Sequence, residues 1–212
     1  MEILYSDRDM AVCVKPVGLD SELEVPAALK EILGGEIFPI HRLDKNVGGV
    51  MVYARTKQAA AELSRAVQGG SMVKEYVALV HGTPPETGDW EDLLWKDSGK
   101  NKVFVVKRLR GGVKKARLEY RVLSAGECSL VRILLHTGRS HQIRVQFASR
   151  GLPLVGERKY AVLEDPCELA LWSCRLSFAH PATGKGMDFS LEPPLVYPWT
   201  ELLQVDRQDE VR

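Results

Sequence analysis

The sequence predicts an α+β fold, built on a large mixed or antiparallel sheet with a few helices. Apolar runs of strand length recur about ten times between turn residues, and most of them are joined by short connections. Helical spacing of apolar residues occurs in three stretches. With 212 residues, 45% of them hydrophobic and 27% charged, the chain has the size and composition of a globular protein. We therefore predict one domain over residues 1–212, with a loose tail over 204–212.

The first half of the chain predicts four strands and two helices. The strands are expected at Glu2–Tyr5, Met10–Lys15, Val50–Ala54 and Val73–Val80. The helices are expected at Pro26–Leu33, where proline is tolerated in the first turn, and at Lys57–Gln68. Thr56 is a suitable N-cap for the second helix, and Gly69 ends it.

The second half predicts five further strands and one helix. The strands are expected at Val103–Lys107, Ala116–Leu123, Ser129–Leu135, Leu169–Phe178 and Met187–Leu191. Pro84–Gly88 is expected to be a loop, and Gly111-Gly112 is expected to turn a hairpin. Ser140 is a suitable cap for a helix from His141 to about Arg150, which Gly151 closes.

Composition argues against several classes of protein. No stretch approaches the ~20 apolar residues of a membrane span, and the N-terminus lacks the pattern of a signal peptide. We therefore expect a cytoplasmic protein. The four cysteines form no CxxC pair, so we expect no zinc site. Cys13, Cys128 and Cys174 lie in apolar runs and are expected to be buried thiols.

His41-Arg42-Leu43-Asp44 precedes two glycines and an apolar strand. In extended backbone, Arg42 and Asp44 point to the same side. A surface ion pair at the entry of a strand explains this stretch, and so does a functional site. The residues alone leave both interpretations open.

A basic stretch follows between Gly99 and Arg121, where Glu119 is the only acidic residue. The basic residues are Lys100, Lys102, Lys107, Arg108, Arg110, Lys114, Lys115, Arg117 and Arg121. This pattern is typical of a solvated hairpin edge or of a basic ribbon that follows nucleic-acid phosphates. The net charge of the chain is only +1, which argues mildly against a nucleic-acid enzyme.

Six stretches together resemble the RluA-type pseudouridine synthases. They are ILYSDRDMAVCVKPVGL, HRLD with a glycine-containing strand, KEYVALVHG, KKARLEYRVL, TGRSHQIRVQFASRGLPLVGERKYA and LALWSCRLSFAHPATGK, in that order. The resemblance covers nearly the whole chain. It implies one catalytic domain around a long bent sheet with the active cleft along its middle. It also implies isomerisation of uridine to pseudouridine in structured RNA, with no metal or organic cofactor. Many members carry an N-terminal S4 domain, whereas this chain resembles the single-domain members.

The resemblance also implies roles for individual residues. Asp44 matches the catalytic aspartate and Tyr76 the tyrosine that lies against the target base. Arg144 is the best match for the basic residue that pairs with the aspartate, and Arg139 is the second candidate. Arg42 matches the arginine that helps to extrude the target nucleotide. The remaining residues expected to contact RNA are His41, Arg139, His141, Lys114, Lys115 and Arg117.

The chain departs from the family pattern at four positions. Val47 and Gly48 replace a threonine and a serine that commonly follow HRLD, and Gly48 is expected to loosen that loop. Glu157 and Ala161 replace the more usual aspartate and glycine. None of these changes removes a named catalytic group.

The proposed chemistry fits these residue types. A carboxylate nucleophile can replace one difficult step in the exchange of a glycosidic bond by two easier steps. A nearby guanidinium favours the ionised form of a buried carboxylate. The target base must leave the stack, and phosphate contacts offset part of that cost. Two alternatives remain: an RNA-binding module that has lost catalysis, and a hydrolase of N-glycosidic bonds. We expect a monomer that acts on ribosomal or transfer RNA.

Overall fold

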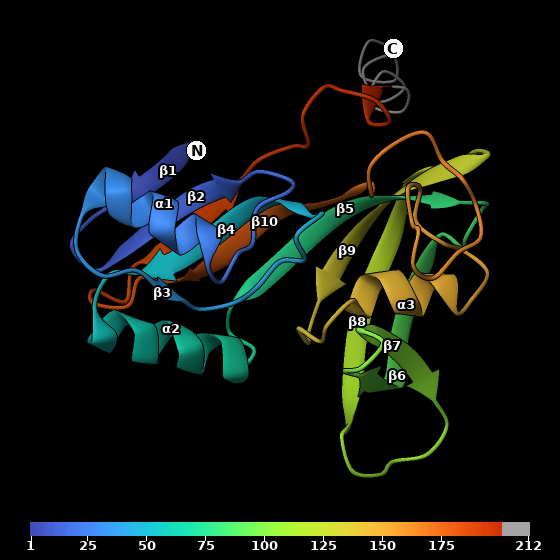
Figure 1. Cartoon of the computed structure of the whole chain (residues 1–212), viewed down its shortest axis with the longest axis horizontal. Helices are drawn as coiled ribbons and strands as arrows, with labels where there is room; N and C mark the ends of the chain where they lie inside the picture. Colours follow the sequence, from blue (N-terminus) through green and yellow to red (C-terminus); the bar gives the residue numbers. More distant parts are fainter. Residues whose placement is uncertain (201–212) are drawn as a thin grey trace. The chain divides into compact units, whose positions relative to one another are not determined.

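The computed structural model describes residues 1–200, which fall into two compact units (Figure 1). Unit 1 comprises residues 1–75 and 172–192, and unit 2 comprises residues 76–171 with the segment from Pro193 onward. The described residues form 11 strands and three helices, which confirms the α+β class. The loose tail expected over 204–212 lies outside the described residues. The expectation of a single domain stays a prediction.

Unit 1 is a mixed sheet with two helices. Its elements are β1 (Ile3–Ser6), β2 (Met10–Lys15), α1 (Glu24–Leu33), β3 (Phe38–Pro39), β4 (Gly48–Ala54), α2 (Lys57–Gln68) and β11 (Gly186–Ser190), with most of β10 (Leu171–Ala179). The strand order is β1-β2-β4-β10-β11, and β3 also pairs with β4. All of these pairs are antiparallel except β4 with β10.

The core of unit 1 follows from the alternation of its strands. Val50 and Val52 of β4 point to the same side and pack with Ala59 and Leu63 of α2. Helix α2 begins as expected, because the Thr56 side chain accepts a hydrogen bond from the Ala59 amide. Each apolar side chain buried in this way contributes about 1.5–3 kcal/mol.

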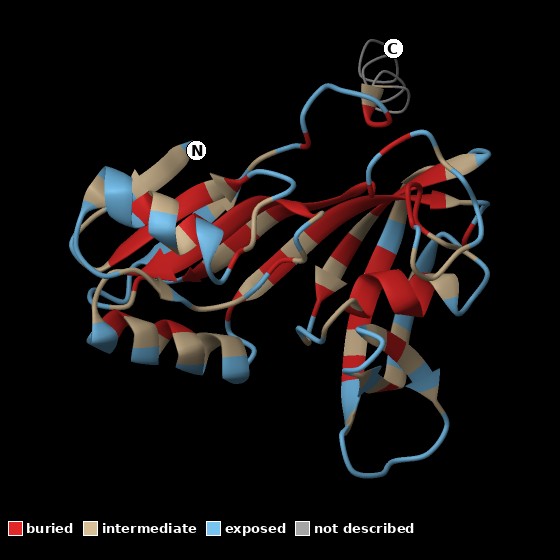
Figure 2. Ribbon diagram, in the orientation of Figure 1, coloured by how far each residue is buried: buried red, intermediate tan, exposed pale blue. Residues whose placement is uncertain are grey.

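Unit 2 contains one helix and a sheet whose four later strands pair antiparallel. Its elements are β6 (Thr87–Asp97), β7 (Lys102–Val106), β8 (Val113–Ser124), β9 (Cys128–Leu135) and α3 (Gln142–Ala148), with most of β5 (Val73–His81). The order of its four later strands is β9-β8-β6-β7. Figure 2 shows α3 buried along almost its whole length. The centre of the Phe147 ring lies 4.6 Å from the centre of the Trp90 ring and 5.3 Å from the centre of the Tyr120 ring.

Strand β6 was not expected, and it changes the topology around it. We predicted a loop over Pro84–Gly88 and assigned no strand to the residues that follow. Acidic residues interrupt the apolar alternation in β6, which weakens its strand signal. Both β7 and β8 pair with β6, so the hairpin predicted at Gly111-Gly112 does not form.

The predicted start of the helix after Ser140 was also wrong. Helix α3 begins at Gln142, and its N-cap is His141 in the left-handed region, with φ of 52°. Among the described residues no side chain caps α3; instead the Gln142 oxygen accepts hydrogen bonds from the Arg139 amide and the Thr137 hydroxyl, which fixes the turn before the helix.

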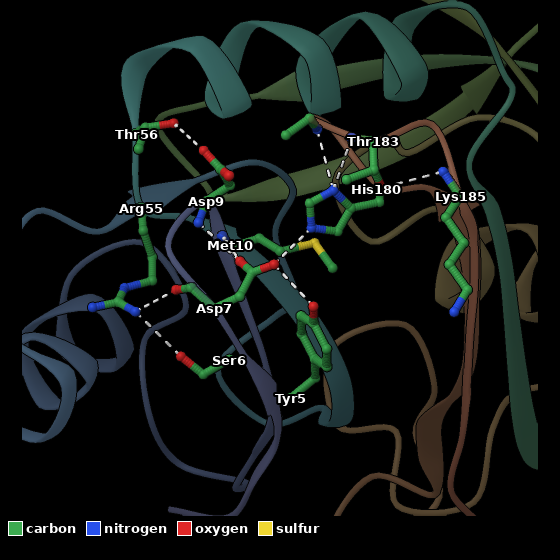
Figure 3. Close-up of polar contacts among 11 residues, drawn as sticks. Tyr5, Ser6, Asp7, Asp9, Met10, Arg55, Thr56, His180, Thr183 and Lys185 are labelled. Carbon is green, nitrogen blue, oxygen red and sulfur yellow. Dashed lines mark hydrogen bonds and ion pairs between the residues drawn. The ribbon is translucent and has the colours of Figure 1, made fainter.

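A polar cluster in unit 1 ties the turn after β1 to the turn after β10 (Figure 3). His180 Nδ1 accepts hydrogen bonds from the amides of Ala182 and Thr183, so its Nε2–H donates to Asp7, at 2.7 Å. Tyr5 and the amide of Met10 also donate to Asp7. Burial raises the pKa of Asp7, but these hydrogen bonds outweigh it and hold the pKa at about 2.

Candidate active site

The turn between β3 and β4 carries Asp44, and its backbone is fixed on both sides of that residue. Ser21 Oγ donates to the Leu43 carbonyl at 2.9 Å and accepts from the Leu43 amide at 3.2 Å. The Val47 amide closes the turn by donating to the Asp44 carbonyl at 2.9 Å. The carbonyl of Ser21 accepts in turn from the Tyr53 hydroxyl in the core. The position of the Asp44 backbone is therefore set by buried groups.

Lys15 holds the other side of this turn. Its ammonium group is fully buried and donates to three carbonyls, those of Pro16, Lys45 and Val47, at 2.9, 3.2 and 2.8 Å. Burial lowers the pKa of Lys15 to about 8, while the charges of Asp20 and Asp44 oppose that shift. The Lys15 ammonium thus ties the turn on the side of Asp44 opposite to Ser21.

His41 and Arg42 differ in their surroundings. The His41 Nε2 accepts a hydrogen bond from the Val52 amide at 3.3 Å. Burial of the ring, with a smaller contribution from Lys74, lowers the pKa of His41 to about 3. A neutral His41 anchored to β4 offers no positive charge to a phosphate. Arg42 is exposed, and its guanidinium lies 3.6 Å from the Glu22 carboxylate, a weak surface contact.

The two glycines that follow Val47 are required by close packing. A Cβ on Gly48 would come within 2.4 Å of the Trp172 ring, and one on Gly49 within 2.2 Å of the Ser173 carbonyl oxygen. Gly48 is buried as the first residue of β4, and Val47 is buried as well. The expected loosening at Gly48 is therefore wrong, because the missing side chain makes room for the Trp172 ring.

Tyr76 lies in the middle of β5 and is 5% exposed. Its neighbours on the same side of the strand, Lys74 and Ala78, are buried too. Because the Tyr76 ring is buried, its neighbours in and around β5 hold it in one orientation.

Arg144 is the buried cation of α3. Its Nε and Nη2 donate to the two oxygens of Glu157 at 2.6 and 2.8 Å, and both side chains are almost fully buried. Burial raises the pKa of Glu157, but hydrogen bonds from Arg144 and from the amides of Lys159 and Tyr160 outweigh it, so the pKa is lowered. Glu157 therefore remains an anion and fixes the plane of the Arg144 guanidinium.

Tyr160 joins several of the groups around Arg144. Its hydroxyl lies 2.7 Å from His141 Nδ1 and accepts a hydrogen bond from the Val103 amide at 2.9 Å. The Arg144 guanidinium lies 5.6 Å from the centre of the Tyr160 ring. Arg139 is exposed, and its Nε donates to the Lys115 carbonyl at 2.9 Å.

The basic stretch is more strongly neutralised than the sequence indicated. Strand β6 places Asp89 and Glu91 beside β8, where Arg117 binds both oxygens of Asp89 at 2.9 Å and Lys115 lies 3.2 Å from Glu91. Arg117 also contacts Glu119 at 2.7 Å. Our expectation that Glu119 alone opposes these cations was therefore wrong, because β6 was missed. Lys114 is exposed and, within residues 1–200, pairs with no acidic side chain.

The predicted residues are divided between the two units. Unit 1 holds His41, Arg42 and Asp44, and unit 2 holds Tyr76, Lys114, Lys115, Arg117, Arg139, His141 and Arg144. Sequence reasoning assigned no role to the residues that hold the predicted ones in place: Lys15 and Ser21 in unit 1, and Tyr160 and Glu157 in unit 2, where Glu157 was noted only as a departure from the family pattern. Lys15 gave one signal, a lysine that ends an apolar strand directly before a proline.

The comparisons with known proteins identify the family. The family described as RNA pseudouridylate synthase matches residues 9–149. The chain belongs to this family. An RNA pseudouridine synthase of Aquifex aeolicus (strain VF5), itself uncharacterised, is 36% identical, with 95% of this chain and 73% of that protein covered. The dual-specificity RNA pseudouridine synthase RluA of Escherichia coli (strain K12) is 35% identical, with 88% of this chain and 90% of that protein covered.

Solved structures agree with this assignment. Human RNA pseudouridylate synthase domain containing 4 superposes with a TM-score of 0.76 at 25% identity, covering 91% of this chain and 88% of that one. A second human protein, RNA pseudouridylate synthase domain containing 1, has the same fold, with a TM-score of 0.79 at 21% identity. The superposition covers 97% of this chain and 94% of that one. The chain is thus an RNA pseudouridine synthase, an isomerase, as the six motifs indicated. No helix within residues 1–200 is long and apolar enough to cross a membrane.

Proposed function

We propose that this pseudouridine synthase uses Asp44 as its catalytic carboxylate on a uridine of structured RNA. The observation that carries this assignment is the fixed turn around Asp44, in which Ser21 holds Leu43 and Lys15 holds Lys45 and Val47. A rigid backbone reduces the entropy that is lost when the carboxylate is positioned for reaction. The family assignment supports the reaction itself.

The reaction exchanges one bond to the ribose for another. The bond from uracil nitrogen to the sugar breaks, a bond from carbon 5 to the sugar forms, and the hydrogen of carbon 5 passes to nitrogen. Every atom is retained and nothing is oxidised. Asp44 can attack the sugar carbon, assist its deprotonation or add to the base, and each route requires an ionised carboxylate.

Two residues of unit 2 complete the proposed machinery. Tyr76 offers an aromatic face to the uracil and a hydroxyl for the proton on carbon 5. Arg144 is the proposed basic residue of the reaction, and its rigid pairing with Glu157 supports this role because a fixed guanidinium directs its remaining donors. Arg42, which is exposed, takes the place of the extruded base, whose unstacking costs a few kcal/mol.

The proposed substrate is a ribosomal or a transfer RNA in the cytoplasm. One relative is named a dual-specificity RNA synthase, and another, from Zymomonas mobilis, a ribosomal large subunit synthase. The basic side chains proposed to contact phosphates are Arg139, His141, Lys114, Lys115 and Arg117. Lys114 and Arg139 are the best candidates among them, because both are exposed and neither pairs with an acidic side chain within residues 1–200.

Analysis of the products tests this proposal. We would incubate the protein with ribosomal and transfer RNA that lack modification, digest the RNA and separate the nucleosides. We expect new pseudouridine and no free uracil. Free uracil would identify an N-glycosidic hydrolase, and RNA binding without new pseudouridine would identify a binding module; either result contradicts the proposal.

A further inference from the structure

A cysteine, a histidine and an aspartate meet in unit 2 outside the residues assigned above. Cys128 Sγ lies 3.7 Å from His81 Nδ1, and the opposite ring nitrogen, Nε2, lies 3.0 Å from Asp165 Oδ2. His81 ends β5, Cys128 begins β9, and Asp165 belongs to the segment between α3 and β10. The pseudouridine synthase activity proposed above makes no use of these three side chains.

The backbone around the three side chains is fixed. The Gly82 amide donates to the Glu127 carbonyl at 2.8 Å, and Ser129 Oγ donates to the Gly82 carbonyl at 2.8 Å. These bonds hold the residue after His81 to the two neighbours of Cys128. The Gly156 amide donates to Asp165 Oδ2 at 2.7 Å, which fixes the carboxylate behind the ring. The order thiol, imidazole, carboxylate is therefore built into the unit.

Cys128 differs from the other three cysteines. We expected Cys128 to be buried, but it is partly exposed, whereas Cys13, Cys167 and Cys174 are buried. Burial raises the pKa of the Cys13 thiol to about 12, and burial together with Asp165 raises that of Cys167. Nucleophilic cysteines lie in partly exposed sites beside a base, and inert ones are buried in apolar surroundings.

The cluster has the features of an activated nucleophile. His81 can take the thiol proton on Nδ1 while its Nε2–H donates to Asp165, which stabilises the imidazolium. Burial raises the pKa of Asp165, but the hydrogen bonds from His81 and Gly156 outweigh it and lower the pKa, so the carboxylate stays ionised. Within residues 1–200 no group of three His, Cys, Asp or Glu side chains is arranged to hold a metal ion.

We infer that Cys128 is a nucleophilic thiol activated by His81 and Asp165, and a site of modification by small peroxides. The thiolate attacks one oxygen of the peroxide; the S–O bond forms as the O–O bond breaks. The leaving oxygen takes the proton from His81 and departs as water when the peroxide is hydrogen peroxide. Sulfur loses two electrons, the peroxide gains them, and Cys128 becomes a sulfenic acid.

The test is oxidation of the whole protein by hydrogen peroxide at pH 7, with dimedone to trap sulfenic acid and mass spectrometry to quantify each cysteine. We expect Cys128 to be trapped at least about tenfold more than Cys13, Cys167 or Cys174, because its site is partly exposed and beside a base. H81N should lower trapping at Cys128 by about fivefold or more, and D165N should lower it less. H136N is the matched control, since His136 lies in the same unit and also contacts a carboxylate, Glu119, at 2.8 Å.

Equal trapping at all four cysteines, or unchanged trapping in H81N, would overturn the inference. Should H81N fail to fold, alkylation of the unmodified protein by iodoacetamide decides the question. A free thiol is only a few per cent thiolate at pH 7, so Cys128 should react at least about fivefold faster than glutathione. A rate at or below that of glutathione would also overturn it.

Discussion

Both oxygens of Glu157 accept hydrogen bonds from the Arg144 guanidinium, at 2.6 Å from Nε and 2.8 Å from Nη2. The two side chains are 0% and 6% exposed, so the pair is held in a medium of low polarity. The amides of Lys159 and Tyr160 donate to the same carboxylate. A buried pair with these additional donors sets the direction of Arg144, the arginine proposed above to take part in catalysis.

The first prediction concerns this pair. E157Q should lower the free energy of unfolding by about 3–5 kcal/mol, because it leaves the Arg144 charge buried beside a neutral partner. E157D restores the charge with a shorter side chain and should recover part of the loss. Denaturant titration measures the unfolding free energy of both variants. E164Q, which changes a glutamate at an exposed position, is the control. Equal stability of E157Q and the unchanged protein would contradict the role of Glu157.

The second prediction concerns Lys15 as a positioning residue for Asp44. K15M retains the length of the side chain but removes the donor to three carbonyls, so we expect a loss of about 1–3 kcal/mol in unfolding free energy. The rate of pseudouridine formation at saturating RNA should fall more than the affinity for RNA. K30M, on an exposed position of α1, should change neither. A loss of stability with an unchanged rate would show that Lys15 only supports the fold.

The third prediction concerns pH and Asp7. The folded pKa of Asp7 is about 2, below its usual value of 3.8. Its ionised form therefore stabilises the fold above about pH 4, and that contribution is lost as pH falls from about 4 towards 2. Because Asp7 is partly exposed, we expect the contribution to be about 1–2 kcal/mol.

Denaturant titrations of the unchanged protein and D7N from pH 7 down to pH 3 measure this contribution. The difference in unfolding free energy between the two proteins should be largest at pH 7 and should shrink below about pH 4. A difference that stays constant over the whole range would show that the Asp7 carboxylate does not stabilise unit 1 through its charge.

The fourth prediction separates two cations of β8. K114Q should weaken RNA binding and reduce the slope of log affinity against log salt by about 0.7–0.9, the value of one phosphate contact. R117Q should change that slope less, because Asp89 and Glu119 already compensate the charge of Arg117. Binding titrations at several salt concentrations measure both slopes. An equal change in the two variants would indicate that Arg117 leaves its acidic partners to bind phosphate.

The regular elements were predictable where apolar residues fill a run of strand length or recur with the period of a helix. Helix α2 has the predicted bounds because its cap, its stripe and its closing glycine agree. Strand β6 was missed because acidic residues interrupt its apolar alternation, and without β6 the pairing of β7 and β8 was wrong as well. Pairing partners of strands follow from tertiary packing, which local patterns do not encode.

The site was predictable only in part. The family motifs indicated Asp44, Tyr76 and Arg144, whose roles stay predictions. They did not indicate that Lys15 and Ser21 hold the turn around Asp44, because those bonds join a side chain to a backbone carbonyl far away in the sequence. Gly48 was interpreted as a loose position, although the Trp172 ring fills the space that a side chain would need. Such packing partners are visible only in three dimensions.

The most direct test of the central claim is the rate of pseudouridine formation by D44N at saturating RNA. The substitution removes the carboxylate with little change of shape, so the variant should fold, bind RNA with nearly unchanged affinity and lose activity by more than about a thousandfold. E36Q, which removes an exposed carboxylate from the same unit, should retain full activity. If D44N instead forms pseudouridine within about tenfold of the unchanged protein, Asp44 is not the catalytic carboxylate.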